Sequence, residues 1–271
     1  METVRLPQSA LMEALQNGPK HVFVTGASRG IGEAIARRFG EDGARLSLAA
    51  RSYNKLLGIA MDIGTDRAHA LRLDLADEQS IDDAIVAAES RFGPIDVLVC
   101  NAGAHDDTPV DDVSVEGRAR FRKIIDINVV GTYYLAQLAA LHMPAGGRII
   151  FIGSVLARFG VPRASAYVAS KHAVLGLTRA MSHELAPRNI RVNSINPGWV
   201  DTKMAHDSLA RMANLSGKPL QQVMAEQLKN QPIRRMIKPE EVAAYVQFLA
   251  GPGGDAVTGQ GIDLSCGSVM V

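Results

Sequence analysis

A glycine-rich loop between an apolar segment and a helical pattern is the feature that most constrains this chain. Residues 21–25, HVFVT, are compact and apolar, as expected for a buried strand, and a helical pattern covers residues 33–39. Between them lie Gly26, Gly30 and Gly32, with the spacing G-x-x-x-G-x-G. Such a loop, followed by a helix N-terminus, presents backbone N–H groups that bind a pyrophosphate. The context predicts a dinucleotide site and disfavours three ordinary turn glycines, although the G-x-G-x-x-G spacing is not met.

Strand-like and helix-like patterns alternate along the rest of the chain. Short apolar segments predict further strands at residues 45–50, 68–74, 97–100, 148–152, 191–195 and 261–264. Apolar residues at helical spacing predict helices at residues 80–92, 121–142, 167–185 and 240–249. This alternation predicts an α/β protein with a Rossmann-like, doubly wound parallel sheet of about seven strands and helices on both faces.

The alternation shows no boundary between domains. Residues 21–271 are expected to form a single dinucleotide-binding and catalytic domain, after an N-terminal extension at residues 1–20 with a short amphipathic pattern at 9–16. One large irregular insert, at about residues 201–231, contains two helical patterns, at 205–215 and 220–230. Such an insert is typical of a substrate lid that closes over a cleft and excludes water.

Composition and charge exclude several function classes. A formal net charge of +1 gives no electrostatic reason to expect nucleic acid or an anionic membrane as partner. No apolar run approaches transmembrane length, and the first residues lack a signal-peptide core. Cys100 and Cys266 make no disulfide framework and suit a reducing compartment, so a cytoplasmic protein is expected. The histidines lack metal-ligand spacing, and no metal is assigned.

The end of the second predicted strand indicates which dinucleotide is bound. In NAD-specific folds a carboxylate near this position holds the ribose hydroxyls. Here the strand leads into Arg51 with no carboxylate, and Ser28 and Arg29 lie inside the glycine loop. Two guanidiniums and a hydroxyl can hold a 2′-phosphate through paired donors. NADP(H) is therefore the preferred cofactor and NAD(H) the second candidate. Two solvated surface arginines are the alternative interpretation.

A second candidate site follows the strand at residues 148–152. Tyr167 and Lys171 are four residues apart, so they share one face of the predicted helix, and Ser154 lies at the end of the strand. A phenol, an ammonium and a hydroxyl in one cleft indicate proton transfer to or from an oxygen. The Tyr-x-x-x-Lys spacing alone is weak, because two ordinary helix residues produce it often.

Taken together, the motifs resemble those of the short-chain dehydrogenase/reductases from about residue 20 to the C-terminus. The resemblance rests on the glycine loop, Tyr167 with Lys171, and four further motifs in order: Asn101-Ala102-Gly103, Asn128, Ser154 and Pro197-Gly198. It implies a catalytic tetrad of Asn128, Ser154, Tyr167 and Lys171. It also implies a set of cofactor contacts: Gly26, Ser28, Arg29, Gly30, Ile31, Gly32, Arg51, Asp74, Leu75, Asn101, Ala102, Gly103, Tyr167, Lys171, Pro197, Gly198, Val200 and Thr202.

The resemblance gives each member of the tetrad a role. Tyr167 would protonate the carbonyl oxygen in reduction and deprotonate the alcohol in the reverse direction. Lys171 would reach the nicotinamide ribose. Its ammonium, together with the charged nicotinamide of the oxidised complex, is expected to lower the pKa of Tyr167 from the ordinary value of about 10. Ser154 would hold the reacting oxygen, and Asn128 would support a water chain that resupplies the proton.

The substrate is less constrained than the reaction. Insert length and the tail at 251–267 resemble aromatic-polyketide ketoreductases and also D-3-hydroxybutyrate dehydrogenases. The latter bind a small carboxylate with a histidine and a lysine, where this chain has Leu156 and Ala164, so that clamp is absent. His183 stands where 3-oxoacyl carrier-protein reductases usually offer a docking arginine. An apolar-bodied ketone or an acyl-thioester 3-oxo substrate is expected, in a pocket with four candidate residues: His105, Leu156, Trp199 and Met204. For His105, a position on a surface loop is favoured over contact with the substrate.

Two other functions stay open. One is an NAD-linked hydroxy-acid or sugar-alcohol dehydrogenase of the same family, and the other is a non-catalytic dinucleotide sensor that regulates a partner. The retained Tyr167 and Lys171 disfavour the sensor. The resemblance also implies a homotetramer, assembled through two long helices at about 117–143 and 167–186.

Overall fold

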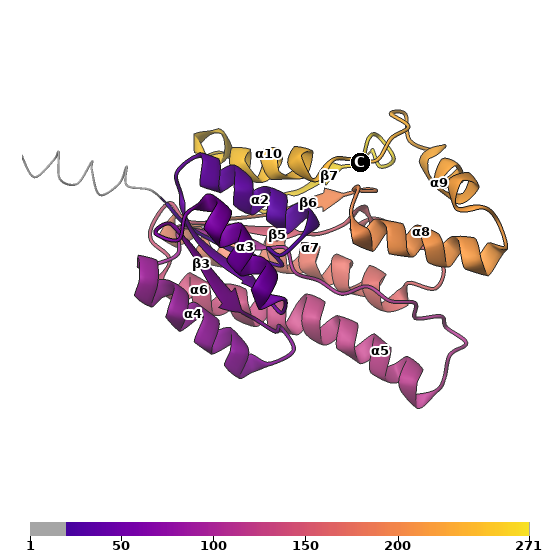
Figure 1. Cartoon of the computed structure of the whole chain (residues 1–271), viewed down its shortest axis with the longest axis horizontal. Helices are drawn as coiled ribbons and strands as arrows, with labels where there is room; N and C mark the ends of the chain where they lie inside the picture. The colour runs from indigo at the N-terminus through magenta and orange to yellow at the C-terminus, as the bar shows by residue number, and fades with distance from the viewer. Residues whose placement is uncertain (1–19, 271) are drawn as a thin grey trace, which may run out of the picture.

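The computed structural model describes residues 20–270, so the amphipathic pattern at 9–16 lies outside the described residues. One sheet holds seven strands in the order β3-β2-β1-β4-β5-β6-β7, and every neighbouring pair is parallel (Figure 1). The strands are β1 (His21–Thr25), β2 (Arg45–Ala50), β3 (Ala68–Arg72), β4 (Val97–Cys100), β5 (Arg148–Ile152), β6 (Arg191–Pro197) and β7 (Gly261–Leu264). The predicted parallel α/β sheet is confirmed.

Helices cover both faces of the sheet, because alternate strand residues point to opposite sides and both sides are apolar. Val22 and Val24 of β1 pack in one layer, whereas Phe23 packs in the other. The first layer contains α2 (Gly30–Glu41), α3 (Tyr53–Ile63) and α10 (Pro239–Ala250). The second contains α4 (Glu78–Phe92), α6 (Thr132–His142) and α7 (Ser165–Leu185).

Helix α3 was not predicted from the sequence. Its buried face is narrow, with Leu56 and Ile59 packed on the core, while Leu57 and Met61 are exposed. The core-facing residues Leu56, Ile59, Ala60 and Ile63 do have helical spacing, but the exposed Leu57 and Met61 and the central Gly58 blur this pattern.

The helix predicted at 121–142 begins earlier and is not uniform. α5 (Val115–Ile125) starts after Ser114, whose hydroxyl accepts the N–H of Gly117 at 2.9 Å. A π-helical segment, η1 (Asp126–Gly131), joins α5 to α6. Gly131 lies directly against the carbonyl of Leu75, where a Cβ atom would clash. Such π segments are frequent at functional sites.

The same long helix corrects a sequence expectation about membrane spans. Residues 115–142 are long and apolar enough to cross a membrane by length and composition, although no such run was expected. Half of its most apolar window is buried inside the molecule. Packing against the sheet and α7 gives a physical reason for this composition.

The insert forms two helices beyond the layered body, α8 (Lys203–Ser216) and α9 (Leu220–Leu228) (Figure 1). They share a small apolar cluster of their own, built from Leu209, Ala213 and Val223. The insert leaves and rejoins the body at one point, where Val200 and Ile237 form a parallel bridge. This arrangement holds α8 over the carboxyl end of the sheet, since β6 leads directly into it.

Candidate active site

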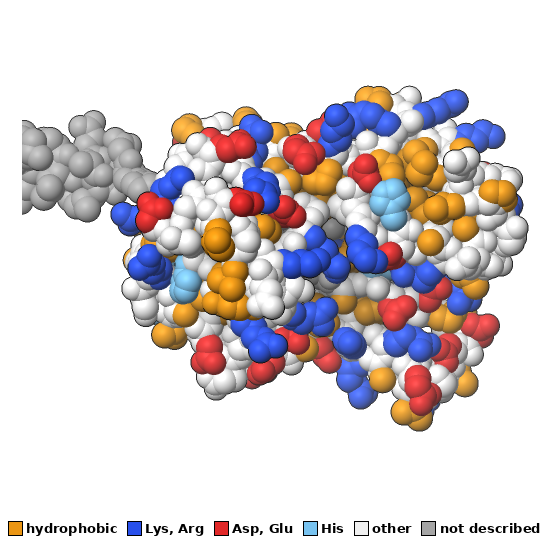
Figure 2. Space-filling view, viewed as in Figure 1, with side chains coloured by type: hydrophobic (Ala, Val, Ile, Leu, Met, Phe, Trp, Pro, Cys, Tyr) orange, Lys and Arg blue, Asp and Glu red, His pale blue; other side chains and the backbone are white. Residues whose placement is uncertain are grey.

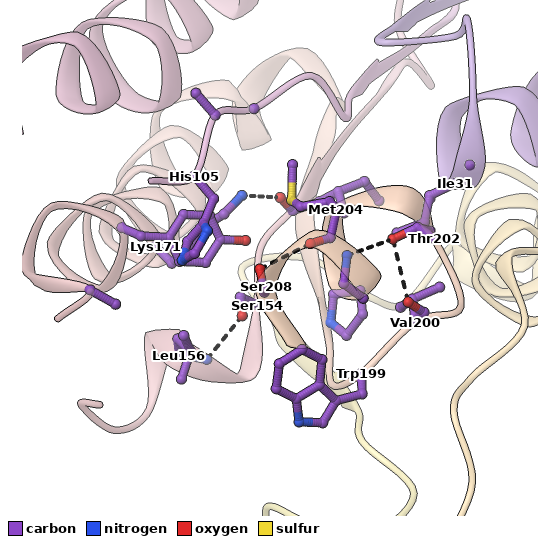
Figure 3. Close-up of a pocket in the computed structure, with 18 of the residues that line it drawn as sticks. Ile31, His105, Ser154, Leu156, Lys171, Trp199, Val200, Thr202, Met204 and Ser208 are labelled. Carbon is purple, nitrogen blue, oxygen red and sulfur yellow. Dashed lines mark hydrogen bonds between the residues drawn. The ribbon is translucent and has the colours of Figure 1, made fainter. Parts of the chain in front are cut away.

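A cleft of about 1230 Å³ lies at the carboxyl ends of the strands and under α8. Ligands of open α/β sheets bind at this edge. The cleft is lined by every site residue expected from the sequence except Gly32 and Asn128. Figure 3 shows how the elements converge: His105, Ser154 and Lys171 lie on one side of the cleft, and Thr202, Val200 and Ile31 on the other. Met204 and Ser208 of α8 lie between them.

The glycine loop has the shape of a cradle. Gly26 and Gly30 adopt left-handed backbone with φ of 66° and 57°, which favours glycine. A Cβ atom at Gly26 would lie 2.8 Å from Asn101 Nδ2, and one at Gly32 would lie 2.5 Å from the same atom. Gly32 is therefore buried behind the loop and shapes it without lining the cleft. Thr202, which caps α8, lies directly over Gly30.

Asn101 joins the glycine loop to the end of β4. Its Nδ2 donates to the carbonyl of Thr25 at 2.8 Å, and the Thr25 hydroxyl accepts the backbone N–H groups of Asn101 and Ala102, both at 2.9 Å. These bonds fix the two loops against each other. A pyrophosphate would fit against the glycine loop, because side chains are absent where the loop backbone is most closely packed.

The three proton-transfer candidates are brought together as expected. Lys171 is buried, its Nζ donates to the carbonyl of Ile152 at 2.8 Å, and this Nζ lies 5.4 Å from the Tyr167 ring centroid. Ser154 lies at the end of β5, contacts the Tyr167 hydroxyl, and accepts the N–H of Leu156 at 3.1 Å. A phenol, a hydroxyl and an ammonium therefore face one region of the cleft.

In the protein alone, the pKa of Tyr167 shifts in the direction opposite to the lowering expected with the oxidised cofactor bound. Burial raises this pKa to about 12, and the hydrogen bond with Ser154 offsets only part of the shift. Burial also lowers the pKa of Lys171 to about 8. In the protein alone, desolvation of the phenolate dominates, and the Lys171 ammonium is engaged by the Ile152 carbonyl. The lowering expected with the oxidised cofactor bound stays a prediction. Near neutral pH the phenol keeps its proton.

Asn128 lies behind the reacting groups instead of in the cleft. It is 2% exposed and lies in the π-helical segment η1. Its Oδ1 accepts the N–H of Ala104 at 2.7 Å, and its Nδ2 donates to the carbonyl of Ala104 at 2.9 Å. Its Nδ2 also donates to Ser170 Oγ at 3.0 Å, and Ser170 donates to the carbonyl of Tyr167 at 2.7 Å. Sequence reasoning missed Ser170. Its link to Asn128 depends on the π-helical turn that carries Asn128.

The outer part of the cleft is cationic. Arg29 and Arg51 both line it and both are exposed. A second hollow of about 630 Å³ is lined by Arg51, Lys55 and Arg72. The parallel register pairs Ala50 with Arg72, which brings the ends of β2 and β3 together. Lys and Arg side chains gather around the middle of the face in Figure 2. Sequence reasoning missed both Arg72, which the strand register places here, and Lys55, which lies in the first turn of α3.

The inner part of the cleft combines an apolar wall with a charged network. Trp199, Leu156 and Met204 line it as expected. His105 also lines it and is partly buried instead of lying on an exposed loop. Its ring stands edge-on to Tyr167, with centroids 4.8 Å apart. Arg211 of α8 contacts His105, a neighbour 106 positions away that no local sequence pattern indicates.

The apolar residues of the insert have two roles, packing within the insert and lining the cleft. Leu209 and Val223 are buried in the insert's own cluster. Met204 and Leu215 are exposed side chains that line the cleft. Met212 packs against the insert's cluster and also lines the cleft. Within residues 20–270, no group of three or more His, Cys, Asp or Glu side chains is arranged to hold a metal ion.

Reductases and dehydrogenases are among the known proteins that this chain resembles in sequence and fold. A family model described as enoyl-(acyl carrier protein) reductase matches residues 26–268. The 3-oxoacyl-[acyl-carrier-protein] reductase MabA of Mycobacterium bovis is 32% identical over 253 residues, covering 93% of each chain. A single-substitution variant of actinorhodin polyketide ketoreductase, solved with NADPH, has a TM-score of 0.85 and 32% identity, covering 92% of this chain and 97% of its own. The 3-ketoacyl-(acyl-carrier-protein) reductase of Brucella melitensis, complexed with NADH, has a TM-score of 0.78 and 30% identity, covering 93% and 98%.

Proposed function

The chain is an oxidoreductase of the short-chain dehydrogenase/reductase family, and we propose that it interconverts a ketone and a secondary alcohol with NADP(H). The observation that carries the proposal is the convergence of Tyr167, Ser154 and Lys171 in the cleft whose outer end is the glycine cradle. A hydride carrier at the cradle and a proton donor at the inner end are the two parts that carbonyl reduction requires.

The cofactor proposal rests on the shape and charge of the outer cleft. The cradle of Gly26, Gly30 and Gly32 suits a pyrophosphate, and Arg29 with Arg51 suits a 2′-phosphate. Similar proteins have been solved with NADPH and with NADH. We therefore propose NADP(H) as the preferred cofactor, with NAD(H) as the second candidate. When bound, the cofactor supplies or accepts the hydride.

Tyr167 supplies the proton in the direction of reduction. Because the pKa of Tyr167 is raised to about 12, the phenol is protonated at neutral pH and ready to donate to a carbonyl oxygen. Ser154, which contacts the same hydroxyl, can donate a hydrogen bond to that oxygen. Lys171 carries its charge below about pH 8 and stabilises the phenolate once the proton has left. Asn128 holds Tyr167 in place through Ser170.

The proposed substrate has an apolar body or is an acyl-thioester with a 3-oxo group. Trp199, Leu156 and Met204 offer an apolar wall beside the reacting groups. Two arginines, Arg163 and Arg211, line the inner cleft, and Asp107 lies between them. Asp107 Oδ2 is 3.2 Å from Arg163 Nε, and Asp107 Oδ1 is 3.5 Å from Arg211 Nε. This carboxylate offsets both charges, which disfavours recognition of a small hydroxy acid by an arginine pair.

The insert is proposed to act as a lid on a single catalytic domain that spans residues 21–271, after an extension at 1–20. The bridge between Val200 and Ile237 closes the base of the insert and can act as its hinge.

A homotetramer is also proposed, since apolar side chains remain exposed along one long helix: Phe121, Val130, Tyr133 and Leu141. Sedimentation that shows only monomer would contradict the assembly. Cytoplasmic location fits the two free cysteines.

A substrate panel tests the function. Purified protein is mixed with NADPH and ketones of three kinds, namely cyclic aromatic ketones, 3-oxoacyl thioesters and small 3-oxo acids, while NADPH absorbance is followed. Parallel reactions with NADP⁺ or NAD⁺ use hydroxy acids and sugar alcohols. We expect reduction of the first two ketone classes and faster turnover with NADPH than NADH. NADPH binding without turnover of any substrate would favour the non-catalytic sensor, and NAD⁺-linked oxidation of hydroxy acids or sugar alcohols would favour the other dehydrogenase.

A further inference from the structure

Arg211 ties the insert to the loop that follows β4. Its Nη2 donates to His105 Nδ1 at 2.8 Å and to Ser208 Oγ at 3.1 Å. Its Nε is buried and makes no hydrogen bond with the described residues, while Asp107 Oδ1 lies 3.5 Å away. A small inward movement of α8 would therefore complete a second bond to the same loop.

The loop that carries His105 is already fixed on both sides. Ala104 is bonded to Asn128, and the N–H of Thr108 donates to the carbonyl of Arg163 at 2.7 Å. The Thr108 hydroxyl accepts the N–H of Ala166 at 3.0 Å, in the first turn of α7. Between these two anchors, the ring of His105 stands at 86° to the Tyr167 ring. Figure 3 shows His105 beside Lys171 on the side of the cleft that holds the reacting groups.

The bond between Arg211 and His105 fixes the protonation state of the imidazole. A guanidinium only donates, so His105 Nδ1 accepts and the ring is neutral with its proton on Nε2. The charged and titratable groups that face His105 are Arg211 from α8, Tyr167 from α7, and Asp106 and Asp107 from its own loop. Burial, followed by Arg211, lowers the pKa of His105, and the two carboxylates oppose this shift only in part. Protonation of the ring would turn the acceptor into a second donor and break the bond.

We propose that His105 is a positioning residue for Tyr167, and that Arg211 is the latch through which helix α8 holds it. The bond between Arg211 and His105 is already made while α8 lies over the cleft, and it holds the phenol in its orientation. Closing of the insert over a substrate would add the second bond, from Arg211 to Asp107. This inference rests on the proposed carbonyl reduction, because it assigns Tyr167 the proton transfer. It adds a coupling between the insert and the reacting groups that works only while His105 is neutral.

Three variants and one control test the latch. Arg211→Met removes the donor and keeps an unbranched apolar stem, and His105→Phe removes the acceptor and keeps a ring against Tyr167. Lys218→Met is the matched control, because it removes an insert cation that pairs with Glu226 on the exposed surface. We expect each single variant to lower kcat by about tenfold, with little change in NADPH Kd. The double variant should lose no more than the worse single variant, because both break one bond.

A pH experiment distinguishes the latch from a general structural role. Wild-type kcat should fall on the acid side as His105 becomes protonated, and both single variants should lack this acid limb. Histidine ring NMR gives a readout that needs no turnover, with the His105 signal assigned by its absence in His105→Phe. In Arg211→Met the pKa of His105 should rise towards its ordinary value of about 6.5. Lys218→Met should leave the His105 titration unchanged.

The outcomes separate the latch from the proposed function. Losses in kcat that multiply in the double variant, or a His105 titration unchanged by Arg211→Met, would overturn the latch. Full activity of His105→Phe would overturn it as well. If NMR shows the coupling but the wild-type protein reduces no carbonyl in the panel, the latch between insert and loop holds, whereas carbonyl reduction and the positioning role for Tyr167 fail.

Discussion

Replacing Ser170 with alanine tests the buried network that holds Tyr167. Ser170 is fully buried, accepts a hydrogen bond from Asn128 Nδ2 at 3.0 Å, and donates one to the Tyr167 carbonyl at 2.7 Å. Ser170→Ala leaves one N–H of Asn128 without this acceptor in the interior. A buried donor left unsatisfied costs about 1–3 kcal/mol. In a chain of this size that loss lowers Tm by roughly 2–12 °C.

Thr178→Val is the matched control on the same helix. Thr178 is also fully buried, but its hydroxyl donates only to the carbonyl of Val174, one turn earlier in α7, at 2.8 Å. A methyl group in its place leaves no side-chain donor unsatisfied, so the free energy of unfolding should fall by less than about 1 kcal/mol.

Denaturant unfolding of both variants, followed by circular dichroism, measures the difference. Ser170→Ala should also lower kcat more than it weakens NADPH binding, because Ser170 bonds the backbone of Tyr167 and does not line the cleft. Equal losses of stability in Ser170→Ala and Thr178→Val would refute the reasoning, since the Asn128 bond would then add nothing to the ordinary cost of a lost hydroxyl.

Three further predictions concern the cleft. Gly32→Ala should abolish NADPH binding in a fluorescence titration, because a Cβ atom there overlaps the glycine loop, whereas Gly58→Ala, with open space around it, should leave binding intact. Arg51→Ala should weaken NADPH binding while sparing NADH, unlike Arg45→Ala at the opposite end of β2; equal weakening of both nucleotides would count against the 2′-phosphate contact. Burial lowers the pKa of Lys171 from 10.5 to about 8, so between these pH values the unfolded chain binds more protons than the folded protein. The free energy of unfolding of the wild type should therefore rise relative to Lys171→Met as pH increases from about 8 to 10.5. Urea unfolding across this range checks it, and a constant difference would contradict it.

The fold could be predicted from the sequence because buried parallel strands are marked by short apolar runs. Residues 45–50, 97–100, 148–152 and 261–264 form the strands at the predicted bounds. Helix α3 was missed because the exposed Leu57 and Met61 blur its one-sided pattern, and the π-helical segment at Asp126–Gly131 has no periodicity of its own. Close contact between Gly131 and the Leu75 carbonyl belongs to the tertiary structure.

The cleft residues were predicted where a motif marks them, and missed where contacts join distant segments. Tyr167, Lys171 and Ser154 come together as their spacing indicated. Arg211 and His105 are 106 positions apart, so only the folded chain brings them into contact. The raised pKa of Tyr167 in the protein alone was not foreseen, because the sequence shows a neighbouring cation but not the depth of burial.

Tyr167→Phe is the most direct test of the central claim that this phenol transfers the proton. The substitution removes one hydroxyl and keeps the ring beside His105 and Lys171. With a ketone that the wild-type protein reduces, kcat should fall on the order of 10²–10⁴-fold, while the NADPH Kd measured by fluorescence stays close to the wild-type value. Retained turnover with unchanged NADPH binding would contradict the assignment of Tyr167 as the acid.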